Sequence, residues 1–347
     1  MKDRNTTLSG GSHLFEVLND QALSLYMIDL PLPLPGFEHQ ITSWLLKDKV
    51  LNRNFLVDIG PASVNPTLEK ALGEAGVSSL DFILLTHIHL DHAGGIGHLL
   101  KTYPHARVVV PYKGKKHLID PDRLWQGSLR TLGEMVLSFG EILAISEGDF
   151  ASEPVFPEHL NIIETPGHAS HHQSFLYEQG GHRILFPGEA AGVILSGDML
   201  PRWTRGTSVP AEMNGPVSEV PDVVYMYPAS PPVFDLDIAR ASLAKLRELE
   251  SDLICYSHYG FSRYPLRLMG LYAEQLELWA SVVRGMLMSY PDSDDEDIIA
   301  GSLRALLASD RFLSCYDMFD DDVRSKEHFF LLNSLQGFLG FFRPSKK

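Results

Sequence analysis

The stretch that most constrains this chain is residues 84–95, LLTHIHLDHAGG, where an apolar run leads into a dense polar cluster. Within six residues the cluster contains His87, His89, Asp91 and His92. Side chains at positions i and i+2 of an extended loop point the same way, so His87 and His89 can converge on one ion. Imidazole and carboxylate together suit Zn²⁺, Fe or Mn rather than Ca²⁺ or Mg²⁺. The alternative is an ordinary polar surface loop.

Further potential ligands follow other strand-like runs. His168 comes after a Pro–Gly turn in ETPGHASHH, Glu189 follows the run LFPG, and His258 ends the run DLICYSH. Layered α/β folds place their functional sites at the carboxyl ends of strands. Each of these residues is therefore a potential ligand in the same topological position as the first cluster.

The apolar pattern of the first 262 residues predicts alternating strands and helices. Aliphatic runs predict strands at 23–30, 41–46, 54–60 and 81–87, and Gly180–Gly181 predicts the turn of a hairpin over 172–189. Residues 65–76 carry helix signals, with Asn65 as a candidate cap and Gly76 as the stop. This alternation favours layers of α and β structure.

After Pro265 the periodicity becomes helical. Two stripes at helical spacing carry large apolar side chains: Tyr272, Leu276, Trp279, Val283 and Met286 in the first, and Leu331, Leu335, Phe338 and Phe342 in the second. We expect these stripes to pack on the core; a lid or the face of a homodimer is the alternative.

The order HxHxDH, TPGH, a Gly–acid pair and a late His resembles the metallo-β-lactamase fold hydrolases over roughly residues 23–262. The resemblance implies an α/β fold, an αββα sandwich of two similar halves with a dinuclear site at one edge between the sheets. We expect residues 1–262 to form this domain and residues 263–347 to form a helical extension packed on it.

The resemblance also implies a ligand set for two divalent ions, Zn²⁺ first, with Fe or Mn as alternatives. The set is His87, His89 and His168 for one ion, Asp91, His92 and His258 for the other, and Glu189 in the place of the bridging acid. That acid is usually Asp, and Glu is one methylene longer. Glu189 therefore bridges both ions, binds one, or withdraws and leaves a single-metal site. We expect His172 to be a structural hydrogen bonder rather than a ligand.

Two metals about 3.5–4 Å apart can share a hydroxide at neutral pH, because metal binding lowers the pKa of water toward about 7. Asp91 would orient that hydroxide for attack on an ester, thioester or lactone of a small molecule. The run TPGHxxxH is similar to glyoxalase II and lactonase members of the family. We expect Trp125, Tyr225 and Tyr227 to wall the substrate pocket.

Two other functions stay open. Persulfide dioxygenases resemble this family but hold one iron with two His and an Asp, so a mono-iron oxidoreductase is the first alternative. A member of the fold that binds metal without turnover is the second, although the full ligand set argues against it. Flavodiiron reductases match less well, since they carry a Glu near the first motif and a flavin domain.

Charge and cysteine content narrow the partners and the compartment. The net charge is −15 and no basic run occurs, which disfavours nucleic acid and anionic membrane surfaces. No apolar run approaches the roughly 20 residues of a spanning helix, and the first residues have no secretory pattern. Cys255 and Cys315 are too few for a disulfide framework, so we expect a reducing, cytoplasmic setting.

Overall fold

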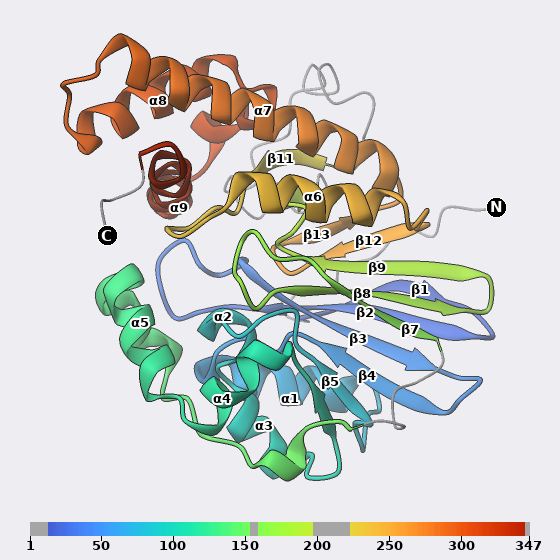
Figure 1. Cartoon of the computed structure of the whole chain (residues 1–347). Coiled ribbons are helices and arrows are strands. Elements are labelled where there is room, and N and C mark those ends of the chain that lie inside the picture. Colours follow the sequence, from blue (N-terminus) through green and yellow to red (C-terminus); the bar gives the residue numbers. More distant parts are fainter. Residues whose placement is uncertain (1–12, 153–158, 197–222, 344–347) are drawn as a thin grey trace. The chain divides into compact units, whose positions relative to one another are not determined.

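The computed structural model describes residues 13–152, 159–196 and 223–343 (Figure 1). The chain forms two compact units. Unit 1 comprises Met1–Leu34, Glu38–Asn161 and Tyr177–His182, and unit 2 comprises Pro35–Phe37, Ile162–Leu176 and Arg183–Lys347. The statements below concern the described residues of each unit.

Unit 1 contains a six-stranded sheet whose strands follow the order of the chain. The strands are β1 (Leu14–Asn19), β2 (Leu23–Leu30), β3 (Ile41–Asp48), β4 (Arg53–Val57), β5 (Phe82–Leu84) and β6 (Arg107–Val109). The pairs from β1 to β4 are antiparallel, whereas β4, β5 and β6 are parallel. Because β4 and β5 are parallel neighbours, the segments that follow them lie at one edge of the sheet.

Short helices and 3₁₀ turns follow the parallel strands of unit 1. They are α1 (Asn65–Glu74), α2 (Leu90–Ala93), α3 (Ile96–Thr102), α4 (Tyr112–Ile119), α5 (Asp122–Leu132) and the 3₁₀ turns η1 (Ala62–Val64), η2 (Gly133–Phe139) and η3 (Glu147–Asp149). The prediction that Asn65 caps α1 is wrong, because Asn65 is already helical and makes no cap hydrogen bond. Its side-chain amide instead donates to the Gly95 carbonyl oxygen at 3.0 Å, which ties α1 to the loop after the histidine cluster.

The second sheet has the strand order β13–β12–β9–β8–β7. Its strands are β7 (Leu160–Glu164), β8 (Gln173–Gln179), β9 (His182–Gly188), β12 (Leu253–Tyr256) and β13 (Gly260–Ser262), and a separate two-stranded ladder joins β10 (Val193–Ser196) to β11 (Val223–Tyr227). The predicted hairpin is present, with Gly180 and Gly181 at positive φ in its turn. Strands β9 and β12 are parallel, so the residues that follow them share one edge.

Unit 2 also contains the long helices of the chain. These are α6 (Leu236–Arg247), α7 (Pro265–Ser289), α8 (Asp295–Ser309) and α9 (Asp321–Phe342), with the 3₁₀ turns η6 (Arg311–Leu313) and η7 (Tyr316–Met318). Helices α6 and α7 lie side by side (Figure 1). As the stripe predicted, Tyr272, Leu276, Trp279 and Val283 are buried, whereas Met286 at its end is half-buried. Among the described residues, no helix is both long and apolar enough to cross a membrane.

A buried carboxylate joins α7 to the start of η6. Trp279 Nε1 and Gln275 Nε2 each donate to Asp310 Oδ2 at 2.8 Å, and the Phe312 amide donates to Oδ1 at 3.0 Å. Burial raises the pKa of the Asp310 carboxyl. Gln275 Nε2 also donates to the Met226 carbonyl oxygen at 2.7 Å, so the same network reaches β11.

Both cysteines lie in unit 2 and are buried as free thiols. Cys255 belongs to β12, and Cys315 lies between η6 and η7. Burial raises the pKa of both thiols, that of Cys315 to about 12. Neither thiol is therefore ionised near neutral pH, and neither has the character of a reactive cysteine.

The C-terminal helices belong to the same compact unit as most of the second sheet. The division of the chain at residue 262 stays a prediction. The mixed α/β class, with a helical C-terminal region, is as expected.

Candidate metal centre

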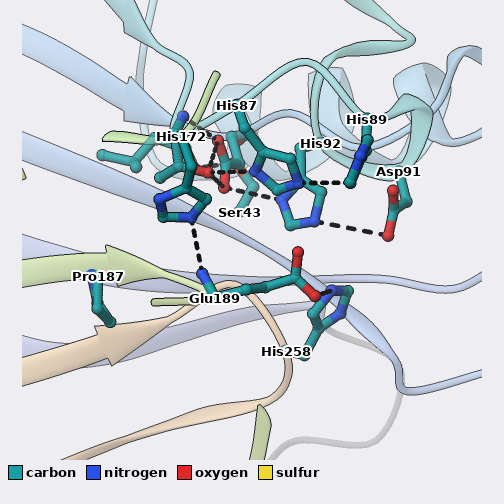
Figure 2. A network of polar contacts seen from close by, with 12 residues as sticks. Ser43, His87, His89, Asp91, His92, His172, Pro187, Glu189 and His258 are labelled. Carbon is teal, nitrogen blue, oxygen red and sulfur yellow. Dashed lines mark hydrogen bonds and ion pairs between the residues drawn. The ribbon is translucent and has the colours of Figure 1, made fainter. Parts of the chain in front are cut away.

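The first cluster lies directly after β5, in unit 1. The strand ends at Leu84, and α2 begins at Leu90, with His89 as its N-cap residue. His87 Nε2 lies 2.9 Å from His89 Nδ1, and the rings of His87 and His92 are 4.1 Å apart (Figure 2). Asp91 Oδ2 lies 3.5 Å from His92 Nε2. The turn into α2 thus gathers the imidazoles and the carboxylate of this motif, and their role as metal ligands stays a prediction.

Asp58, the residue after β4, fixes the orientation of His92. Asp58 is buried and accepts hydrogen bonds from His92 Nδ1 at 2.9 Å and from the Thr86 amide at 2.8 Å. A carboxylate only accepts, so Nδ1 of His92 carries the proton and Nε2 keeps its lone pair. Nε2 is the nitrogen that faces Asp91. This is the carboxylate–histidine arrangement that orients metal ligands in proteins.

The Thr86 hydroxyl determines in the same way which nitrogen of His87 carries the proton. The Thr86 hydroxyl donates to Asp58 Oδ2 at 2.8 Å, so it accepts from His87 Nδ1, which is 3.0 Å away. Nε2 of His87 therefore also keeps its lone pair. The Ser43 hydroxyl donates to the Asp58 carbonyl oxygen at 2.6 Å and holds that residue, whose φ is 48°, in place.

Unit 2 contains a second cluster built around Glu189, which follows β9. His168 Nε2 lies 2.8 Å from Glu189 Oε2. His258 Nε2 lies 3.4 Å from Glu189 Oε1 (Figure 2). His168 Nδ1 donates to the Ala229 carbonyl oxygen at 2.9 Å, which directs Nε2 toward the carboxylate. The three side chains are buried, and each oxygen of Glu189 faces a different imidazole.

His172 is a structural hydrogen bonder, as expected. Its Nε2 accepts from the Glu189 amide at 3.1 Å, so Nδ1 carries the proton and donates to Thr165 Oγ1 at 2.9 Å. The chain of hydroxyls continues through Ser174 Oγ, 2.8 Å from Thr165 Oγ1, to the Pro187 carbonyl oxygen at 3.0 Å. This network holds the end of β9, from which Glu189 projects.

The residues predicted to wall a substrate pocket lie in different settings. Trp125 is half-buried in α5 of unit 1. Tyr225 and Tyr227 are buried in β11 with ring centroids 5.6 Å apart, and Tyr225 packs edge-on against Phe319. Their contribution to a pocket stays a prediction.

A cavity in unit 2 borders the Glu189 cluster. Its lining includes His168, Glu189, Phe234 and Tyr272. Sequence reasoning missed Tyr272 as a site residue, because its helical spacing made it one member of an apolar stripe. Asp58 and Thr86 were missed as well, although a carboxylate that closes the apolar run NFLV is a usable signal of a buried acceptor.

The donors of both clusters fit a transition-metal ion. Each of them offers imidazole nitrogens and one carboxylate. This mixture suits Zn²⁺, Fe or Mn and does not suit Ca²⁺ or Mg²⁺. In His87, His92 and His168 one nitrogen is bound to a protein acceptor, and the other keeps the lone pair that a metal requires.

Comparison with known proteins adds a family context. The family model described as the metallo-beta-lactamase superfamily matches residues 36–258. The solved structure of TTHA1429 from Thermus thermophilus, a metallo-beta-lactamase family protein, gives a TM-score of 0.54 at 19% identity. That match covers 92% of this chain and 93% of the other, and at this identity it shows similarity of fold alone.

Curated relatives match shorter parts of the chain. It is 28% identical over 194 residues to the metallo-beta-lactamase fold-containing protein ST1585 of Sulfurisphaera tokodaii, covering 53% of this chain and 62% of that protein. It is 31% identical over 146 residues to a hydroxyacylglutathione hydrolase of Aeromonas salmonicida, covering 42% of this chain and 44% of that one. The chain thus spans less than two thirds of the length of these two relatives.

Proposed function

The chain belongs to the metallo-β-lactamase superfamily, and from this premise we propose that it is a metal-dependent hydrolase of small-molecule esters, thioesters or lactones. The family is consistent with the α/β fold and the helical C-terminal region described above. One relative is named as a hydrolase of hydroxyacylglutathione, an acyl thioester, which supports this class of substrate.

The observation that carries the proposal is the position of the Glu189 carboxylate. One oxygen lies 2.8 Å from His168 Nε2 and the other lies 3.4 Å from His258 Nε2. In the proposed ligand set these two histidines belong to different ions. A carboxylate with one oxygen toward each of them has the arrangement that a shared ligand needs, and the longer Glu side chain supplies the reach.

The proposed ligand set is the one that the family resemblance implies. It consists of His87, His89 and His168 for one ion, Asp91, His92 and His258 for the other, and Glu189 for both. Seven ligands are more than the four that one tetrahedral ion uses, so we expect about two ions per chain. The ions are Zn²⁺ by preference, with Fe or Mn as alternatives.

In the proposed hydrolysis, Asp91, Asp58 and His172 have separate roles. Bound divalent ions would supply a Lewis acid for the substrate carbonyl and lower the pKa of water. Asp91, whose side chain is 27% exposed, accepts a hydrogen bond from the attacking water and orients it. Asp58 keeps His92 in the correct tautomer. His172 holds the Glu189 backbone, so the carboxylate keeps its direction.

Substitution of Glu189 tests the proposal. Glu189→Gln removes the shared negative charge, so the second ion should be lost first and hydrolysis should fall with it. Glu189→Asp restores the family's usual residue and should keep both ions and much of the rate. Metal content, hydrolysis of an ester, thioester and lactone panel, and oxygen uptake are measured for the parent and both variants. Glu164→Gln, an exposed carboxylate on β7, is the matched control.

Each outcome separates the alternatives. Parallel loss of the second ion and of hydrolysis supports the dinuclear hydrolase. One ion per chain with oxygen uptake, unchanged in Glu189→Gln, would instead identify a mono-iron oxidoreductase. Two ions per chain with no turnover of the panel would favour a member of the fold that binds metal without catalysis.

A further inference from the structure

Residues 228–235 connect β11 to α6 and contact the loop of the proposed ligand His168 at two points. At one end of this segment, the Ala229 carbonyl oxygen accepts from His168 Nδ1 at 2.9 Å. At the other end, the Asp235 amide donates to the Gly167 carbonyl oxygen at 3.3 Å. Both bonds lie within unit 2. The direction of the His168 ring therefore depends on the position of this segment.

The backbone of residues 228–235 is strained at Val233. This residue has a φ of 78°, a conformation that β-branched residues rarely adopt. Its side chain is 98% exposed, so packing of that side chain does not explain the conformation. A strained backbone persists only where the surrounding structure determines it. Contacts of the segment with the rest of unit 2 therefore fix its shape.

Helix α9 packs directly against this segment. The Ser230 hydroxyl donates to the Ser334 carbonyl oxygen at 3.1 Å. Phe338 packs on Phe234 with ring centroids 5.2 Å apart, and all four side chains are buried. At Gly337 the two backbones meet, because a Cβ atom there would overlap the Ser230 carbonyl oxygen and lie 2.8 Å from its carbonyl carbon.

The glycine at position 337 is what allows this close approach. Glycine is unfavourable inside a helix relative to alanine, but any side chain at this position would push α9 and the segment apart. Ser230 follows Ala229 directly, so a displaced Ser230 carbonyl also moves the acceptor of His168. Helix α9 lies beyond residues 36–258, which match the family model.

We propose that α9 is a positioning element of the metal centre, and that it acts on His168 through Gly337, Ser230 and the Ala229 carbonyl oxygen. None of the proposed ligands comes from α9. The helix instead holds the acceptor that binds the His168 Nδ1 proton and so directs Nε2 toward an ion. The inference rests on the proposed function in one respect, the role of His168 as a ligand. Metal affinity and the packing of α9 are then linked, and each strengthens the other.

Two alanine substitutions on α9 test the proposal. Gly337→Ala forces the backbones apart and should weaken metal binding about 10–100-fold. Gly340→Ala is the matched control, since Gly340 is exposed and a Cβ atom there would meet nothing within 4 Å. Both variants gain the same helix propensity, so the difference between them isolates the contact with Ser230. Competition with a chromogenic chelator measures the affinity, and urea unfolding of the metal-free protein measures stability. A loss of stability without a loss of affinity would overturn the proposal, because α9 would then support the fold alone.

A milder variant covers the case in which Gly337→Ala does not fold. Ser230→Ala removes one hydrogen bond to α9 and should weaken metal binding by up to about tenfold. Ser309→Ala is its control, because the exposed Ser309 hydroxyl also donates to a helix carbonyl oxygen, that of Ala305 at 2.7 Å. If Gly337→Ala does not fold, equal affinities in Ser230→Ala and Ser309→Ala would overturn the proposal.

The ring proton on His168 Nδ1 gives a measurement that needs neither metal nor turnover. In the metal-free parent it should appear as a slowly exchanging downfield proton NMR signal, which is assigned by its loss in His168→Gln. In Gly337→Ala, but not in Gly340→Ala, this proton should exchange about tenfold faster or more. Faster exchange with unchanged metal affinity would support the positioning and would count against the proposed ligand set alone. Equal exchange in the two variants would overturn the proposal even if metal affinity falls, because the effect would then bypass His168.

Discussion

Asp58 is not among the proposed metal ligands, yet it determines which nitrogen of His92 can bind a metal. The same logic holds for His87 through Thr86 and for His168 through the Ala229 carbonyl oxygen. Acceptors of this kind typically contribute about 10–100-fold to metal affinity.

Replacing Asp58 by Asn should weaken metal binding about 10–100-fold, because the amide no longer forces the His92 proton onto Nδ1. Competition with a chromogenic chelator measures the affinity, and far-UV circular dichroism verifies the fold. Asp122→Asn, on the exposed side of α5, is the control. Unaltered affinity in a folded Asp58→Asn protein would show that His92 needs no second partner.

Replacing Asp91 by Ala should abolish turnover with little loss of stability. Its side chain on α2 is partly exposed, so its loss should cost little stability. Its proposed roles are to bind an ion and to orient the attacking water, so turnover should be lost. Steady-state hydrolysis and urea unfolding are the two measurements. Activity within tenfold of the parent, about 1.4 kcal/mol in barrier terms, would contradict this role.

At the scale of single residues, the sequence predicted those site residues that stand close together in the chain at a characteristic spacing. His87, His89, Asp91 and His92 are clustered in the chain, so local geometry brings them together. Asp58 has no such spacing, since its partners come from a loop 28 residues later and a helix 34 residues later. Its role depends on the pairing of β4 with β5, which one sequence does not specify.

At the scale of elements, caps and apolar periodicity indicated where helices lie. The ends and partners of the strands depend on pairing between segments far apart in the chain. Asp235 caps α6, as its side chain accepts from the Ile238 amide at 3.0 Å, and Asp is one of the residues preferred at this position. Strand β5 ends at Leu84, three residues before the predicted end at 87, where the chain turns into the histidine loop. The β10–β11 ladder was not predicted, because Val193–Ser196 pairs with a segment about 30 residues away.

Replacing Asp310 by Ala should lower the free energy of unfolding by about 2–4 kcal/mol, because it leaves the Trp279 and Gln275 donors buried without an acceptor. Urea titration with tryptophan fluorescence measures the loss. A loss below about 0.5 kcal/mol would mean that α7 does not depend on this network.

The isosteric variant Asp310→Asn tests the direction of the pH effect. Burial raises the pKa of the folded-state carboxyl above its usual value, so protonation favours the fold. The stabilisation is fully present below the unfolded pKa of about 3.9 and is lost as pH rises through the raised value. The parent should therefore gain stability relative to Asp310→Asn as the pH falls from 7 toward about 4. A difference that is constant across this range would contradict the assignment.

At the scale of the whole molecule, the chain folds as two compact units, and the C-terminal helices are part of the second. Helices α7 and α9 bury Trp279 and Phe338 against each other, with ring centroids 5.9 Å apart. Phe338 also packs on Phe234, which precedes α6. The cytoplasmic setting and a homodimer through these helices stay predictions.

A chain shortened to residues 1–262 should fail to form a stable fold, because unit 2 would lose the apolar faces that cover α6 and β11. Solubility and thermal unfolding are compared with those of the full chain. A cooperative transition in the shortened chain would support an independent domain that ends at residue 262.

The reactivity of the two cysteine thiols can report how often unit 2 opens. Both cysteines of the chain lie in unit 2, so unit 1 contains none. An alkylating reagent reacts with thiolates, and these thiols become exposed and easily ionised only when the surrounding structure opens. The rate of alkylation under native conditions therefore reports the opening of unit 2 alone. It needs no engineered label, and its slowing by added metal would measure how strongly the metal restrains that unit.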